Sequence, residues 1–174
     1  MALNNKELLA VTVSFFFCII TASCGYRFSG SGDLPSGVES VCIKILKNTT
    51  GETGVENIIT NDIIYEFTRN KREVLTHSNK ADAVLAGKIK SINIVTISHR
   101  GEYTTLERRV SVNLDLELTG RDNNVLWLGK GVSDSETYYV ADDKMTTENN
   151  KHKAIEELSK RLAEKVYNSL TDNF

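Results

Sequence analysis

Few side chains in this 174-residue sequence have the types and spacing that catalysis or metal binding needs. None of the three histidines, His77, His99 and His152, lies at a metal-ligand spacing from another histidine or cysteine. Asp142 and Asp143 are adjacent acids, but neighbours in sequence rarely converge on one substrate atom. Nucleophile elbows, P-loops and HExxH motifs are absent from the sequence. We therefore expect no enzyme activity, no metal site and no cofactor.

The chemistry that the sequence does favour is acylation of a thiol, at Cys24. The uncharged apolar run at residues 8–20 has the length of a secretory signal and is short for a membrane span. Thr21, Ala22 and Ser23 then lead directly to Cys24. This order resembles the bacterial lipobox, whose cysteine receives a diacylglycerol and then an acyl chain, although Thr21 stands where leucine is usual. The pattern predicts a signal peptide at residues 1–23 and a lipidated Cys24.

Two alternatives to lipidation stay open. An ordinary secretory signal could be cut near Cys24, which would then form a disulfide with Cys42, or the apolar run could remain as a membrane anchor. If Cys24 is lipidated, two or more acyl chains anchor the protein firmly in the membrane, because each methylene buried in the bilayer contributes about 0.8 kcal/mol to binding. Gly25, where aspartate would signal retention at the inner membrane, resembles the sorting rule for outer-membrane lipoproteins. Cys42 would then be a lone thiol, off the main core face, and we expect it to be inert.

Charge and aromatic residues exclude some binding functions. The net charge of −2 argues against a general nucleic-acid binder. Arg108 and Arg109 are neighbours on a predicted strand, so they point to opposite faces and form no single basic patch. We expect Trp127 to be a core anchor with its indole N–H satisfied. Tyr138 and Tyr139 also alternate, so at least one should be exposed or lie at an interface.

The first half of the mature chain predicts a tether, a strand and a helix. Residues 24–37 form the lipidated N-terminus and a flexible tether, in which SGSGDLPSG is rich in small residues. A single domain then occupies residues 38–174, beginning with a period-two strand at residues 38–46. Thr53 and Glu56 fit a capping box at the start of a helix that ends near Asn70.

The second half predicts three strands and a long helix. Residues 83–98 alternate with a change of face near Lys90 and Ser91, which indicates a bulge. Residues 106–118 alternate without interruption, and a further strand follows the GRDNN turn. The final helix starts at Thr146 or Thr147 and runs to about Leu170. The order β-α-β-β-β-α predicts an α+β fold, with two helices on one face of a four-stranded, mostly antiparallel sheet.

Several segments, in this order, resemble the LptE family of lipopolysaccharide-assembly lipoproteins: CGYRFSG, LPSGVESVCI, ADAVLAGKI, VLWLGKG, YYVADD and LAEKVYNSLTDNF. The resemblance runs from Cys24 to the C-terminus. It implies a lipoprotein anchored at the periplasmic face of the outer membrane, with two helices against a sheet. It also implies a one-to-one partner, the LptD β-barrel, which the lipoprotein plugs and helps to assemble. Together the two deliver lipopolysaccharide to the outer leaflet.

The resemblance further implies that basic loop residues at one end of the sheet meet the phosphates of lipid A. Arg100, in SHRGEY, is the closest match, and Lys144, in ADDKM, is the second. Asp142 and Asp143 depart from a purely basic loop, and a solvated surface residue is the alternative for each cation. For the whole protein, the alternative is a free-standing outer-membrane lipoprotein that acts as an envelope scaffold or binding module.

Overall fold

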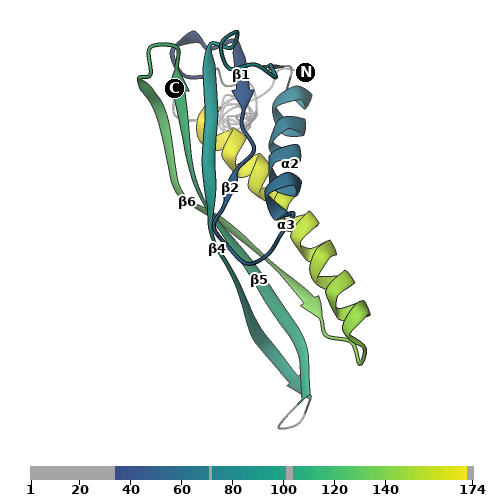
Figure 1. Cartoon of the computed structure of the whole chain (residues 1–174). Coiled ribbons are helices and arrows are strands. Elements are labelled where there is room, and N and C mark those ends of the chain that lie inside the picture. Colours follow the sequence, from purple (N-terminus) through teal and green to yellow (C-terminus); the bar gives the residue numbers. More distant parts are fainter. Residues whose placement is uncertain (1–33, 71, 101–103, 172–174) are drawn as a thin grey trace, which may run out of the picture.

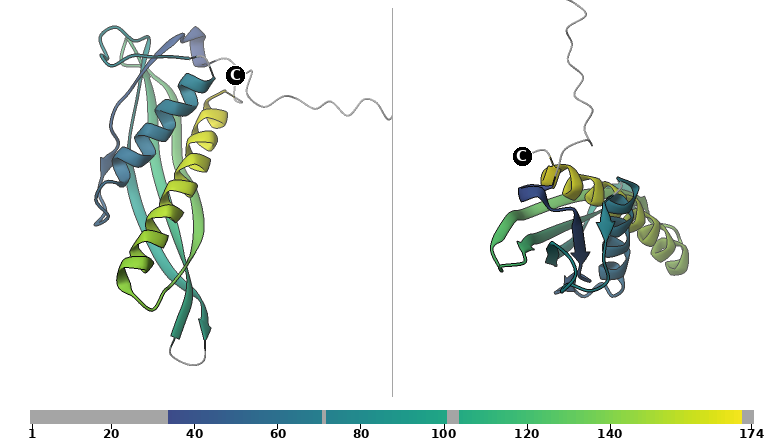
Figure 2. Two further views of the ribbon diagram at one scale, coloured as in Figure 1. Left: turned by 90° about the vertical axis from the view of Figure 1, so that its right-hand side faces the viewer. Right: turned by 90° about the horizontal axis from the view of Figure 1, so that it is seen from above.

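Two helices and a mixed sheet make up the folded body. The computed structural model describes residues 34–70, 72–100 and 104–171, apart from the side chains of residues 36, 100, 104 and 105. Both helices lie over the same face of a curved sheet, and the hairpin of β4 (Ala83–Arg100) and β5 (Thr104–Gly120) extends past them at one end (Figures 1 and 2). The predicted α+β class is correct. No described helix combines the length and the apolar character that crossing a membrane requires.

The sheet has six strands, and not the four that the sequence predicts. Its strand order is β3-β1-β4-β5-β6, and β2 pairs separately with β4. The strands are β1 (Ser40–Ile43), β2 (Lys47–Asn48), β3 (Glu73–Val74), β4 (Ala83–Arg100), β5 (Thr104–Gly120) and β6 (Val125–Tyr139). Strand β1 runs parallel to β3 and β4, β2 runs parallel to β4, and only β4, β5 and β6 are antiparallel. The sheet is therefore mixed.

Length and connection explain the two errors about the sheet. Strands β2 and β3 have two residues each, which is too short to show a period-two pattern. Helix α2 (Val55–Arg69) connects β2 to β3, and a helical crossover returns the chain in the same direction, so that β1 and β3 pair in parallel. The single strand predicted at residues 38–46 is divided, because β1 ends at Ile43 and β2 begins at Lys47.

The long antiparallel strands confirm the alternation in the sequence. Alternate residues of β5, from Val110 to Leu118, are buried against the helices. The predicted bulge in β4 is confirmed, because the register with β5 shifts between Ile89 and Ser91. Trp127 lies in the core as predicted. Tyr138 is buried while Tyr139 is 70% exposed, so the prediction for this pair is also confirmed.

Both helix starts differ from their predictions. Gly54, and not Thr53, occupies the N-cap of α2, with a φ of 88° that suits glycine. Glu56 does reach back as a capping box requires, since its Oε1 accepts the Gly54 N–H at 3.3 Å. Helix α3 (Lys144–Thr171) begins two residues before Thr146, because the Asp143 carboxylate accepts the Thr146 N–H at 2.7 Å.

The core also includes residues outside the predicted domain. Leu34 is buried in the main hydrophobic core, and a 3-10 turn, η1 (Pro35–Gly37), follows it. Leu34 and η1, which lie within the segment predicted to be a tether, are therefore part of the described fold. Cys42 is a buried free thiol outside the main core cluster, and its Sγ lies 3.8 Å from the Thr76 carbonyl. Cys24 lies outside the described residues.

Candidate functional site

The candidate cations Arg100 and Lys144 belong to segments at the same end of the molecule. Arg100 is the last residue of β4, and its side chain lies outside the described part of the structure. Lys144 is the first residue of α3 and is exposed. The β4–β5 hairpin and the start of α3 both lie at the end remote from η1 and from the end of α3 (Figures 1 and 2). We call this the distal end.

The loop that leads into α3 is held firmly, which fixes the backbone of Lys144. The Thr147 hydroxyl accepts the Ala141 N–H at 3.0 Å and lies within hydrogen-bond distance of the Ala141 and Asp143 carbonyls. The backbone N–H of Thr146 is the main reason that the pKa of Asp143 lies below its ordinary value. Asp143 therefore acts as a helix cap, and Lys144 follows it as an exposed cation on a fixed backbone.

The charges of three cations act on one carboxylate, Glu148, near the start of α3. Lys151 binds Glu148 at 2.7 Å and Glu52 at 3.1 Å. The hydrogen bond from Lys151 is the main reason that the pKa of Glu148 lies below its ordinary value, and the charges of Lys144 and Arg108 lower it further. Burial would lower the pKa of Lys151, but its hydrogen bonds to Glu148 and Glu52 outweigh burial and raise that pKa. Glu148 and Lys151 therefore form an ionised pair at neutral pH.

Arg108 is the residue that sequence reasoning failed to connect with Lys144. The alternation correctly separated it from Arg109, since Arg108 is half-buried on the helix-facing side and Arg109 is exposed. Only the packing of α3 beside β5 and β6 brings Arg108 near enough for its charge to lower the pKa of Glu148. These two residues are forty positions apart, and no local sequence pattern connects them.

Exposed apolar side chains accompany the cations at the distal end. Tyr139 ends β6 and is 70% exposed, and Met145 in the first turn of α3 is 74% exposed. Ile94, Val95 and Ile97 of β4 are also exposed. Cations and exposed apolar groups at the same end of the molecule give a surface that can contact an amphipathic anion, with phosphates on the cations and hydrocarbon on the apolar groups.

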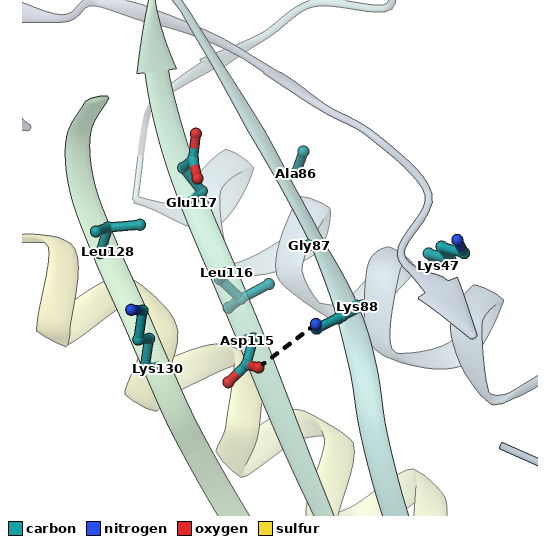
Figure 3. A pocket seen from close by; sticks show the side chains of 9 residues that line it. All are labelled: Lys47, Ala86, Gly87, Lys88, Asp115, Leu116, Glu117, Leu128 and Lys130. Carbon is teal, nitrogen blue, oxygen red and sulfur yellow. Dashed lines mark ion pairs between the residues drawn. The ribbon is translucent and has the colours of Figure 1, made fainter. Parts of the chain in front are cut away.

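A second feature lies on the sheet face that the helices leave uncovered. An open pocket of about 470 Å³ is lined there by Lys47, Lys88, Asp115, Leu128 and Lys130, among others (Figure 3). One oxygen of Asp115 lies 3.9 Å from the ammonium groups of both Lys88 and Lys90. The Gly131 N–H donates to the other oxygen at 3.1 Å. The lining of this pocket carries three lysines and two acids, Asp115 and Glu117. No group of acids, cysteines and histidines among the described residues could hold a metal.

Comparisons with known proteins match this architecture. The family model for LptE, described as lipopolysaccharide-assembly, matches residues 38–170. A comparison with curated proteins found no match.

Three solved structures share the fold. Lipoprotein B from Nitrosomonas europaea has a TM-score of 0.59 at 14% identity, over 83% of this chain and 88% of its own. Rare lipoprotein B from Shewanella oneidensis has a TM-score of 0.55 at 11% identity, over 76% of this chain and 94% of its own. A minor lipoprotein from Acinetobacter baumannii has a TM-score of 0.53 at 15% identity, over 78% of this chain and 92% of its own. At these identities the likeness shows the fold alone.

Proposed function

The chain belongs to the LptE family of lipopolysaccharide-assembly proteins, and from this premise we propose that it is a non-enzymatic outer-membrane lipoprotein. In this proposal Cys24 carries the lipid and holds the protein at the periplasmic face of the outer membrane. The folded body plugs an LptD-like β-barrel in a one-to-one complex and helps the barrel to assemble. The pair takes part in the transport of lipopolysaccharide and in its insertion into the outer leaflet.

The observation that carries the proposal is the family match over residues 38–170, joined to the cations of the distal end. Lys144 is exposed on a fixed helix start, and Arg100 ends a strand that reaches the same end of the molecule. Tyr139, at the end of β6, and Met145, in the first turn of α3, add exposed apolar surface at this end. Lipopolysaccharide carries phosphates next to acyl chains, so this combination suits it better than it suits a purely polar anion.

The uncovered face of the sheet supports the role of a plug. Between the charged residues at its ends, this face carries short uncharged polar side chains that alternate with the buried ones. They are Ser91, Asn93, Ser111, Asn113, Ser133, Ser135 and Thr137. The lumen of a membrane β-barrel is polar, so a face of this composition can lie against it without burying unpaired charge.

Affinity purification of the full chain from detergent-solubilised outer membranes tests the proposal. We expect one large β-barrel protein to co-purify at one-to-one stoichiometry, identified by mass spectrometry. The alternative function, a free-standing lipoprotein that acts as a scaffold or binding module, predicts recovery without a barrel. Recovery of a lone monomer would therefore reject the plug and favour the alternative.

A further inference from the structure

The edge of β4 that faces away from β5 changes from paired to open along its length. Strand β1 pairs with its first part, and β2 pairs with Lys88 and Ile89. The Thr49 N–H to Ile89 carbonyl bond, at 3.3 Å, is the last backbone contact on this edge. Among the described residues, no strand pairs with it farther along. We call residues 91–96 the open edge, because register shifts at both ends enclose a regular stretch there.

The register shows which backbone groups the open edge presents. In an antiparallel ladder, alternate residues direct both their N–H and C=O toward one neighbour. The Ser133 and Ser135 carbonyls bond to α3 side chains, so they point away from β5. Their β5 partners Asn113 and Ser111 must then bond to Ser91 and Asn93 of β4. It follows that Ile92, Ile94 and Thr96 direct their backbone groups to the open edge.

The opposite edge of the same three-stranded meander is closed by side chains. From α3, the side chains of Asn150, Arg161 and Lys165 donate to the carbonyls of Tyr139, Ser135 and Ser133, at 3.0, 2.9 and 3.1 Å. The Asp134 and Glu136 carboxylates accept the N–H groups of Ser135 and Thr137. Exposed edges recruit other strands unless they are blocked in this way. The fold therefore blocks the edge of β6 and leaves that of β4 available.

Charge and side chains indicate what the open edge can accept. Strand β4 contains no acidic residue, and Lys88 and Lys90 precede the open edge while His99 and Arg100 follow it. Ile94 and Val95 point to opposite faces, and both are exposed. A second copy of the chain, paired antiparallel, would place like charges together. We propose that the open edge docks an extended strand of another protein, with apolar residues at its centre and acidic residues at its ends.

This inference stands independently of the role in lipopolysaccharide assembly, because it needs only the open edge. The test measures backbone amide hydrogen exchange by NMR on the full chain in detergent micelles. The probe is a heptapeptide with glutamate at both ends and alternating valine and threonine between them. We expect it to slow exchange at Ile92, Ile94 and Thr96 by about tenfold or more. The same peptide with lysine ends, or with alternate amides N-methylated, should give no protection.

Matched variants locate the binding. Thr96→Pro removes an outward N–H from the open edge without removing a bond to β5, and it should abolish protection. Thr137→Pro makes the same change on the blocked edge of β6 and should leave protection unchanged. If Thr96→Pro lowers the melting temperature, Ile94→Asp serves as the test variant instead. An aspartate at this position leaves the backbone N–H groups in place, and its negative charge repels the glutamate-ended peptide.

Four outcomes would overturn the proposal. They are no protection by the glutamate-ended peptide, equal protection by the lysine-ended peptide, and a sedimentation dimer that protects these amides by itself. The fourth is protection of the same amides in the monomeric chain alone, which would mean that another segment of this chain occupies the edge.

Discussion

The rings of Phe67 and Tyr167 meet edge to face, with centroids 5.3 Å apart and planes at 89°. Phe67 lies in the last turns of α2 and Tyr167 in those of α3, and both rings are fully buried. This contact joins the two helices above the sheet. The hydroxyl of Tyr167 is also buried, and it has no hydrogen-bond partner among the described residues.

The buried hydroxyl leads to a prediction about stability. Tyr167→Phe keeps the ring contact and removes a polar atom whose burial nothing compensates, so we expect the free energy of unfolding to stay equal or rise by about 1 kcal/mol. Phe67→Ala should lower it by about 3–5 kcal/mol, because it leaves a cavity between the helices. Denaturant titration measures both values. A loss of stability in Tyr167→Phe would show that the hydroxyl has a partner.

Strand β5 leaves no room for a side chain at Gly87 of β4. A Cβ on this residue would lie 2.5 Å from the Asp115 carbonyl oxygen, which is backbone and cannot move aside. Gly87→Ala should therefore lower the free energy of unfolding by about 1–3 kcal/mol. Gly51→Ala is the matched control, because a Cβ there meets nothing within 4 Å. Equal thermal melting of the two variants would contradict the close approach.

The ion pairs between α3 and β6 predict a dependence of stability on pH. Asp134, 13% exposed, lies 2.9 Å from Lys165 and 3.3 Å from Arg161. Burial would raise the pKa of Asp134, but hydrogen bonds from Lys165, the Ser135 N–H and Arg161 outweigh burial and lower that pKa. The ionised carboxylate therefore stabilises the fold above its unfolded pKa, near 4, and this contribution is lost as pH falls below it.

Asp134→Asn should lower the free energy of unfolding at pH 7 by about 1–3 kcal/mol. The difference from the parent chain should shrink below about pH 4. Urea denaturation across pH 3 to 7 measures this difference. Asp122→Asn, at an exposed turn residue, should change stability little at any pH. A constant difference across the whole range would mean that the charge of Asp134 is not what stabilises the contact.

Lipidation is tested at Cys24. If this residue carries the acyl chains, Cys24→Ala should abolish metabolic labelling of the protein with palmitate. Cys42→Ala removes the other cysteine of the predicted mature chain and should keep the labelling, because Cys42 is buried as a free thiol. Persistent labelling of Cys24→Ala would place the lipid elsewhere.

The cations of the distal end are tested by charge reversal. Arg100→Glu and Lys144→Glu should each weaken lipopolysaccharide binding by about three- to tenfold without changing the melting temperature, because phosphate contacts are charge-assisted. Lys80→Glu is the control, because Lys80 is exposed but lies just before the start of β4, while Arg100 lies at the opposite end of that strand. An equal loss of binding in Lys80→Glu would point to a general effect of charge. A fall in the melting temperature of either variant would show that its cation stabilises the fold.

The long elements could be predicted because each has one wet face and one buried face. Apolar residues alternate along β5 and recur at helical spacing in α2 and α3, so the sequence itself indicates which face of each element is buried. The bulge near Lys90 was visible for the same reason, since one extra residue moves the apolar positions to the other face. Strands β2 and β3 were missed because two residues make no pattern, and the number of strands was wrong as a result.

The sequence alone therefore determined the α+β class, the family resemblance and the candidates Cys24, Arg100 and Lys144, because these depend on residue types in chain order. The tertiary structure decided that β1 pairs in parallel on both sides and that Arg108 acts on the same carboxylate as Lys144. It also decided that β6 is closed while part of β4 is open. These properties join residues distant in the chain, and only the packing of the helices on the sheet brings them together.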